Sequence, residues 1–164
     1  MFYDEVLVEV EAGRGGDGCM AFRREKYIPM GGPFGGNGGK GGDIIFVTDN
    51  GLKTLIDLRY QKIIKGKTGA NGEGKNKNGA GASDTIIKVP VGTTIKDAET
   101  GAIIADLTKN EEEVIVAYGG RGGRGNVSLA TRSNPCPSYA ERGEPGEKRK
   151  IKVELRMLAD VGLV

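Results

Sequence analysis

Residues 31–42 read Gly31-Gly32-Pro33-Phe34-Gly35-Gly36-Asn37-Gly38-Gly39-Lys40-Gly41-Gly42, and no other segment constrains the architecture as strongly. Glycine returns at every third residue in two interleaved series, which are Gly32, Gly35, Gly38, Gly41 and Gly36, Gly39, Gly42. A period of three matches the polyproline II helix, which has three residues per turn and no internal hydrogen bonds. Because glycine has no side chain, one edge of such a helix is bare, so that several helices can pack backbone to backbone.

The same spacing recurs in three other segments, at Gly13 and Gly16, at Gly66, Gly69 and Gly72, and at Gly119, Gly122 and Gly125. Glycine-rich composition alone would suit flexible linkers, and six prolines are too few for a collagen rod. Four segments with one spacing in a chain that otherwise has the pattern of a folded protein favour a packed bundle instead. We predict a glycine-rich subdomain formed by about residues 13–42, 66–82 and 119–146. Its structural glycines are expected to be Gly32, Gly35, Gly38, Gly41, Gly119, Gly122 and Gly125.

The segments outside the glycine runs have the pattern of β-strands. Val6, Val8 and Val10 alternate along residues 4–11, as expected for a strand with one buried face. Similar short apolar runs, separated by Gly, Asn, Asp and Pro, lie at residues 43–48, 52–58, 85–89, 103–107, 114–118 and 151–155. No long stretch keeps an uninterrupted helical period. The pattern therefore predicts an all-β fold, either a sandwich or a barrel.

Composition limits the chemistry that is open to the chain. The sequence has no histidine, which removes the usual general base near neutral pH and the commonest metal ligand. Cys19 and Cys136 are too few for a disulfide framework or a four-cysteine zinc site, so we expect two reduced thiols and no metal site. No apolar run approaches the ~20 residues that span a bilayer, and the N-terminus lacks a signal-peptide pattern. We therefore expect a cytoplasmic protein without a membrane span.

Two segments approach the phosphate-binding P-loop pattern without completing it. Residues 61–68 begin with Gln61 where the first glycine must turn, and residues 69–76 end with Asn76 where a magnesium-binding hydroxyl belongs. Nothing singles out a carboxylate pair, such as Asp17 with Asp43, for acid/base catalysis. We therefore predict that this chain has no catalytic residues and is not an enzyme by itself.

The basic residues are more informative, although the net charge is only +2. Many of them lie in or beside the glycine segments, where flexible cations and exposed amides suit a phosphate backbone. They are Arg14, Arg23, Arg24, Lys26, Lys40, Lys62, Lys65, Lys67, Lys75, Lys77, Arg121, Arg124 and Arg132. The aromatic residues Phe22, Tyr27, Phe34 and Tyr139 lie near them, although aromatic residues that flank strands often belong to a core. A solvated charged face is the simplest interpretation of any single lysine, but the clusters favour RNA.

Several motifs resemble one known family. They are Met1-Phe2 with Asp4, Ala21-Phe22-Arg23-Arg24-Glu25-Lys26-Tyr27, Gly31-Gly32-Pro33 through Lys40-Gly41-Gly42-Asp43, Ile87-Lys88-Val89-Pro90-Val91-Gly92-Thr93, Gly119-Gly120-Arg121-Gly122-Gly123-Arg124-Gly125-Asn126 and Leu158-Ala159-Asp160-Val161-Gly162-Leu163-Val164. With them the chain resembles the N-terminal domain of the Obg family of bacterial GTPases, which act in assembly of the large (50S) ribosomal subunit. The resemblance covers nearly the whole chain.

This resemblance implies a bundle of short polyproline II helices on a small eight-stranded β-barrel, the Obg fold, over residues 1–158. Residues 159–164 would begin the first strand of a Ras-like G domain that is absent from this chain. GTP, Mg²⁺ and the hydrolysis of GTP to GDP would belong to that domain, so no cofactor is expected here.

The resemblance also implies a partner, the RNA of the large subunit near the peptidyl-transferase region. The loop residues at the corresponding positions, and therefore the expected RNA-binding residues, are Arg23, Arg24, Lys26, Lys75, Lys77 and Arg132. We expect a monomer that positions a GTPase on the ribosome in subunit assembly and in stress and growth control. A protein-interaction module that docks a stress-signalling partner is the alternative. A nucleotide-binding enzyme that uses Lys67 or Lys75 is a third hypothesis.

Overall fold

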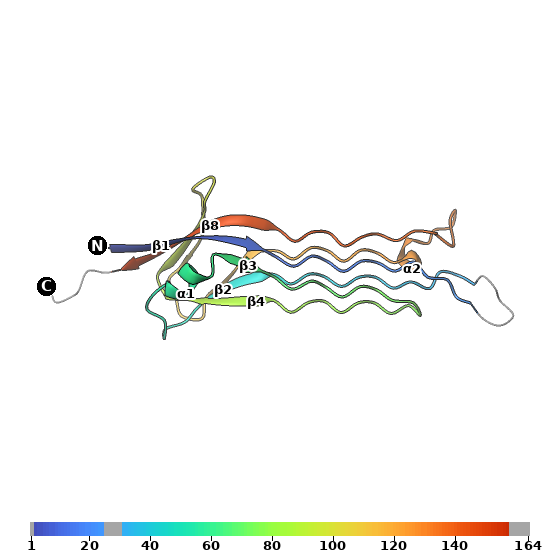
Figure 1. Ribbon diagram of the computed structural model, residues 1–164, viewed down its shortest axis with the longest axis horizontal. Coiled ribbons are helices and arrows are strands. Elements are labelled where there is room, and N and C mark those ends of the chain that lie inside the picture. Colours follow the sequence, from blue (N-terminus) through green and yellow to red (C-terminus); the bar gives the residue numbers. More distant parts are fainter. Residues whose placement is uncertain (1, 25–30, 158–164) are drawn as a thin grey trace.

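Strands form one end of the molecule and a long bundle of extended segments forms the other (Figure 1). The computed structural model describes residues 2–24 and 31–157, and within them it has eight strands and two short helices. The chain is therefore mostly β, as predicted. No helix within these residues is long and apolar enough to cross a membrane.

Five strands form one sheet in the order β3-β1-β8-β5-β6. Their bounds are β1 (Phe2–Glu11), β3 (Ile63–Lys65), β5 (Thr93–Asp97), β6 (Ile103–Leu107) and β8 (Lys148–Met157). Strands β1 and β8 pair antiparallel over ten residues, from Phe2 opposite Met157 to Glu11 opposite Lys148. The alternating valines of β1 place Val6, Val8 and Val10 in the core, because successive side chains of a strand point to opposite faces.

The other three strands form a second sheet in the order β4-β2-β7. Their bounds are β4 (Thr85–Val89), β2 (Ile44–Thr48) and β7 (Glu113–Ala117). Both sheets contribute to one core, with Ile44 and Phe46 from β2 and Ile151 and Val153 from β8. The prediction of a closed barrel is wrong. Within the described residues the two sheets are separate, with β3 and β6 as the edge strands of one and β4 and β7 as the edge strands of the other.

The sequence had suggested a strand at residues 52–58, and this prediction is wrong. Helix α1 (Ile56–Tyr60) lies there and buries Leu58, while the preceding residue Leu55 is also buried. The buried carboxylate of Asp4 on β1 accepts a hydrogen bond from the Leu55 backbone N–H at 3.3 Å and pairs with Arg59. A contact with a distant strand therefore holds this short helix, which its local sequence did not reveal. Strands β3 and β5 were likewise not predicted.

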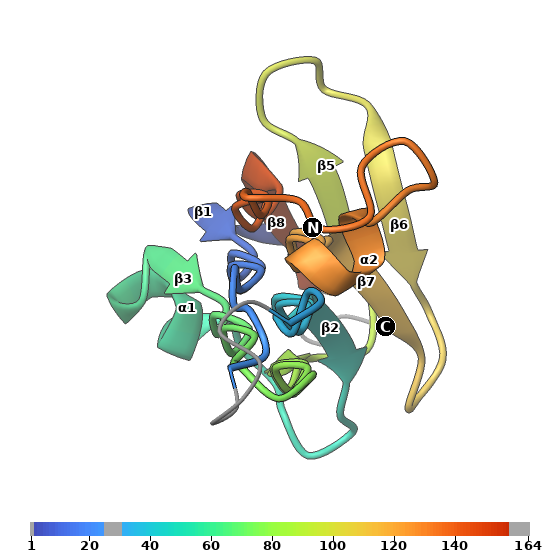
Figure 2. The same ribbon diagram turned by 90° about the vertical axis from the view of Figure 1, so that its right-hand side faces the viewer.

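The long end of the molecule consists of six extended segments, which together we call the glycine bundle. They are residues 12–21, 35–43, 66–73, 77–84, 118–126 and 141–147. Each one continues a strand: the first leaves β1, the second enters β2, and the others join β3, β4, β7 and β8 in the same way. Figure 2 looks along these segments and shows them packed side by side. The bundle is therefore an extension of the two sheets.

Hydrogen bonds between segments, in steps of three residues, hold the bundle together. The N–H groups of Gly13, Gly16 and Cys19 donate to the carbonyl oxygens of Gly42, Gly39 and Gly36 at 2.9, 2.8 and 2.9 Å. Segment 35–43 in turn donates to segment 66–73 on one side and to segment 118–126 on another. Segment 35–43 therefore has a central position in the bundle, in contact with several other segments.

This close packing is possible because glycine has no side chain. A Cβ at Gly38 would overlap the carbonyl oxygen of Gly16, and one at Gly122 would overlap that of Gly38. Similar overlaps with neighbouring backbone occur at Gly35, Gly41, Gly119 and Gly125. A Cβ at Gly32 would meet no atom within 4 Å, so the packing reason assigned to Gly32 from the sequence does not apply there.

A comparison of two alanine substitutions tests this backbone contact. Gly38→Ala forces a methyl group into the backbone of segment 12–21, so we expect the free energy of unfolding to fall by roughly 1–3 kcal/mol or more. Gly81→Ala is the matched control, because the nearest atom to its Cβ is 3.8 Å away and alanine restricts the unfolded chain. Urea unfolding and amide hydrogen exchange of Gly13 and Gly16 would measure both effects. Equal stability of the two variants would contradict the packing.

Candidate nucleic-acid interface

Three turns close the end of the glycine bundle that lies far from the sheets (Figure 1). We call this end the tip and define it by residues 21–34, 73–77 and 126–140. Each turn connects an outgoing segment with a returning one, so residues that are far apart in sequence meet here. Residues 25–30 of the first turn lie outside the described residues.

Backbone hydrogen bonds order the first two turns. The Arg23 N–H donates to the Gly32 carbonyl at 3.0 Å, and the Gly31 N–H donates back to Arg23 at 2.6 Å. The second turn places Lys75 and Asn76 at φ values of 65° and 56°, a left-handed conformation that non-glycine residues seldom adopt. The Asn76 N–H also donates to the Phe34 carbonyl at 2.8 Å, which joins the second turn to the first.

Asn126 joins the third turn to the first. It begins helix α2 (Asn126–Leu129) and is fully buried. Its Oδ1 accepts a hydrogen bond from the Gly35 N–H at 2.8 Å, and its Nδ2 donates to the carbonyls of Ala21 and Pro137 at 2.9 and 3.2 Å. In the sequence Asn126 ends the motif of residues 119–126, directly after the glycine series, but this pattern did not indicate its role.

Other Asn and Asp side chains in the bundle act in the same way. The side-chain oxygens of Asn37, Asp17 and Asp43 accept hydrogen bonds from the backbone N–H groups of Gly125, Gly143 and Gly119 at 2.8, 2.8 and 2.7 Å. These side-chain oxygens accept hydrogen bonds from backbone N–H groups at the surface of the bundle, where no neighbouring segment among the described residues offers a carbonyl oxygen. Asp17 and Asp43, considered above as a catalytic pair, therefore have structural contacts.

The tip collects the cations that the sequence selected. Arg23, Arg24, Lys75, Lys77 and Arg132 are all exposed there, whereas Lys26 lies outside the described residues. Among the residues that the structure describes, Arg24, Lys75, Lys77 and Arg132 have no ion-pair partner. Their positive charge is therefore available to a ligand.

Four cations on the sides of the bundle differ, because carboxylates neutralise them. Arg124 forms two hydrogen bonds with Glu141, at 2.9 and 3.0 Å. The other pairs are Arg14 with Asp17 at 3.7 Å, Lys40 with Asp43 at 2.6 Å and Arg121 with Glu144 at 3.5 Å. Lys67 donates to the Ser83 hydroxyl at 3.2 Å. Arg142 and Lys67 have no carboxylate partner within the described residues, but unpaired cations gather most densely at the tip, which suits it to a polyanion.

Aromatic side chains at the tip differ in exposure. Tyr139 is 54% exposed, whereas Phe22 and Phe34 are half-buried and Phe22 forms a β-bridge with Pro33. Tyr27 lies outside the described residues. Tyr139 is therefore the aromatic residue among these three whose ring is most open to a ligand.

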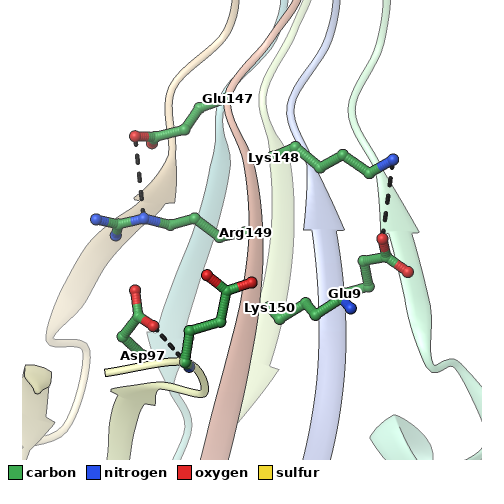
Figure 3. A pocket seen from close by; sticks show the side chains of 7 residues that line it. Glu9, Asp97, Glu147, Lys148, Arg149 and Lys150 are labelled. Atoms are coloured by element: carbon green, nitrogen blue, oxygen red, sulfur yellow. Dashed lines mark hydrogen bonds and ion pairs between the residues drawn. The ribbon is translucent and has the colours of Figure 1, made fainter. Parts of the chain in front are cut away.

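A hollow of about 570 Å³ where the sheets meet the bundle offers a different chemistry (Figure 3). Carboxylates and cations alternate around it, with Lys148 beside Glu9 at 3.8 Å and Arg149 beside Glu147 at 3.9 Å. Backbone N–H groups of Thr100 and Glu99 lower the pKa of Asp97, which they hold in a turn. The described residues contain no group of three or more metal-ligating side chains. The opposite charges in this hollow largely neutralise one another.

Comparisons with known proteins agree with the sequence motifs. The model of the GTP1/OBG family matches residues 3–157. A protein named GTPase Obg from Levilactobacillus brevis is 60% identical over all 164 residues, and those from Ligilactobacillus salivarius and Streptococcus pyogenes are 59% and 58% identical. The chain spans 38% of the length of each of these relatives.

The Arg124–Glu141 pair predicts a pH dependence of stability. The side chain of Arg124, followed by its backbone N–H, lowers the pKa of Glu141 to about 2. The stabilisation is therefore complete above the ordinary glutamate pKa of about 4.3 and disappears as the pH falls through about 2. We expect Glu141→Gln to lower the thermal midpoint at pH 7, and this difference from the wild type to vanish near pH 2.

A double-mutant cycle provides the control for this prediction. In an Arg124→Gln background, Glu141→Gln should change the thermal midpoint much less, because the guanidinium is absent and the backbone N–H of residue 124 remains as a donor. A midpoint difference that stays constant from pH 7 to pH 2 would show that the ion pair is not its cause.

Proposed function

Because the chain belongs to the GTP1/OBG family, we propose that it is the ribosome-binding part of a GTPase that acts in assembly of the large ribosomal subunit. The observation that carries this proposal is the group of tip cations without an ion-pair partner in residues 2–24 and 31–157, which are Arg24, Lys75, Lys77 and Arg132. The ligand would be RNA of the large subunit near the peptidyl-transferase region.

The glycine bundle supports this proposal because it fixes the cations in space. Every third backbone N–H along its inner segments is bonded to a neighbouring segment, and the bundle carries its three turns far from the sheets. Contacts of cations with phosphates would supply affinity, and the fixed shape of the tip would supply specificity. We further propose that the six segments are polyproline II helices, as their period of three and their intersegment hydrogen bonds favour.

The rest of the proposed function belongs to the longer relatives. GTP, Mg²⁺ and hydrolysis would reside in a G domain, whose first strand would begin at residues 159–164, outside the described residues. This chain would position that domain on the ribosome in the cytoplasm, and it would do no chemistry itself. Both near P-loops support this division of roles, because residues 66–73 lie in the bundle and do not lead into a helix.

A triple variant, Arg24→Ala, Lys75→Gly and Arg132→Ala, tests the tip. Glycine suits the positive φ of residue 75, so the second turn is retained while its cation is removed. We expect at least a tenfold loss of affinity for isolated 50S subunits. Removal of three phosphate contacts should also make the slope of log K against log salt shallower by about 2. Cosedimentation across a salt series measures both quantities.

The matched control removes three cations that already have partners, through Arg14→Gln, Arg121→Gln and Lys148→Gln. It changes the net charge by the same amount as the tip variant. Equal losses of affinity for 50S subunits in the two variants would therefore show a general effect of charge and contradict a specific role of the tip. If the wild-type chain instead retains a stress-signalling protein after ribonuclease treatment and ignores 50S subunits, the interaction-module alternative replaces the proposal. Retention of labelled GTP by this chain would favour a nucleotide site at Lys67 or Lys75.

A further inference from the structure

The outer face of the five-stranded sheet is mostly a solvated lattice of charges. Lys152 on β8 pairs with Glu5 on β1 at 3.0 Å, and Lys148 pairs with Glu9 at 3.8 Å. Across β5 and β8, Lys96 pairs with Glu154 at 3.1 Å. Such cross-strand pairs are the ordinary way in which one face of an antiparallel sheet meets water.

Exposed aliphatic side chains interrupt this lattice at Ile103 on β6 and, close together, on β1 and β3. Leu7 on β1 is 61% exposed and Ile63 on β3 is 56% exposed. Both line a hollow of about 250 Å³, which Ala98 also lines together with Val8 and Ile151, whose side chains are buried in the core. A second hollow adjoins the first, shares Leu7 and Lys62 with it, and reaches Arg59 on α1. Together the two form an open groove, which we call the Leu7 groove.

Some of the charged side chains that line the Leu7 groove have ion-pair partners and others do not. Glu5, Glu9 and Arg59 already have partners, which are Lys152, Lys148 and Asp4. Lys62 and Lys150, which flank the aliphatic pair, form no ion pair with any residue in the ranges 2–24 and 31–157. Figure 3 shows Glu9 joined to Lys148 while the nearby Lys150 has no such connection. The groove therefore combines an apolar floor with an excess of positive charge.

We propose that the Leu7 groove binds an acidic peptide segment of a partner protein. An apolar side chain of the peptide lies between Leu7 and Ile63, and carboxylates on either side of it meet Lys62 and Lys150. The charge complementarity of the rim selects acidic sequences, and burial of the two aliphatic side chains supplies affinity.

RNA fits this groove less well than it fits the tip. Aliphatic side chains offer no aromatic face on which bases could stack, whereas they can bury an apolar side chain of a peptide. Strands β1 and β3 lie at the opposite end of the molecule from the tip (Figure 1). The peptide site is thus separate from the proposed RNA site, and both can be occupied at once.

Selection from a displayed library of random twelve-residue peptides tests the proposal on the 164-residue chain. We expect the selected peptides to place Asp or Glu on both sides of a large apolar residue. Their affinity should fall at least tenfold for the variant Leu7→Ser with Lys62→Glu, which changes only exposed side chains. The matched control is Ile103→Ser with Lys109→Glu, an equally exposed pair on and after β6, which should bind as the wild type does.

Four results would overturn the proposal. They are the absence of any enriched peptide, enriched peptides without acidic residues, equal binding to the Leu7→Ser/Lys62→Glu variant, and stronger perturbation of the Leu7 and Ile63 methyl resonances by single-stranded RNA than by peptide. Self-association in sedimentation velocity that the variant abolishes would assign the groove to a second copy of the chain. Because the tip cations are intact in every variant, binding to 50S subunits tests the proposed function separately.

Discussion

Direct contact between bare backbones is the constraint on which the rest of this molecule depends. In the glycine bundle the N–H groups of one segment donate to the carbonyls of the next at intervals of three residues, as from Gly13 and Gly16 to Gly42 and Gly39. A side chain at most of these glycines would occupy the place of a neighbouring carbonyl. The bundle therefore has almost no hydrophobic core of its own, and its cohesion comes from satisfied backbone groups.

The two sheets supply what the bundle lacks. A single core with Phe46, Ile95 and Ile151 holds the strands together. The ten-residue pairing of β1 with β8 continues into the bundle, where segment 12–21 follows β1 and segment 141–147 precedes β8. Since each bundle segment leaves or enters a strand, the sheets set where the segments begin and how they are spaced. Asn and Asp side chains then complete the hydrogen bonding at surfaces where a neighbouring backbone is missing, with Asn126 buried at the far end.

This construction separates the charges by function. Cations along the bundle, such as Arg124 and Lys40, are neutralised by carboxylates a few ångströms away, whereas Lys75 and Arg132 at the tip have no such partner among the described residues. The opposite end carries an apolar groove with two lysines that form no ion pair within the part of the chain that the structure describes. The proposed RNA contact and the proposed peptide contact thus use different chemistry at the two ends of the molecule.

The sequence by itself determined the periodic features, because periodicity is local. Glycine spacing identified the packed positions such as Gly38 and Gly122, and alternation identified β1, β2, β4, β6, β7 and β8. It failed at Gly32, which repeats the spacing without a close neighbour, and at α1, whose position depends on Asp4 about fifty residues earlier. The motifs also identified the family and located the exposed cations of the tip.

Only the tertiary structure decided which segments become neighbours. Two sheets form where a closed barrel was expected, segment 35–43 lies at the centre of the bundle, and Asn126 bonds to Gly35 across 91 positions of sequence. Local pattern carries no information on such pairings, because any bare glycine edge can in principle meet any other. Whether a cation is neutralised, as Arg124 is and Lys75 is not, follows from those neighbours and is therefore decided at the same level.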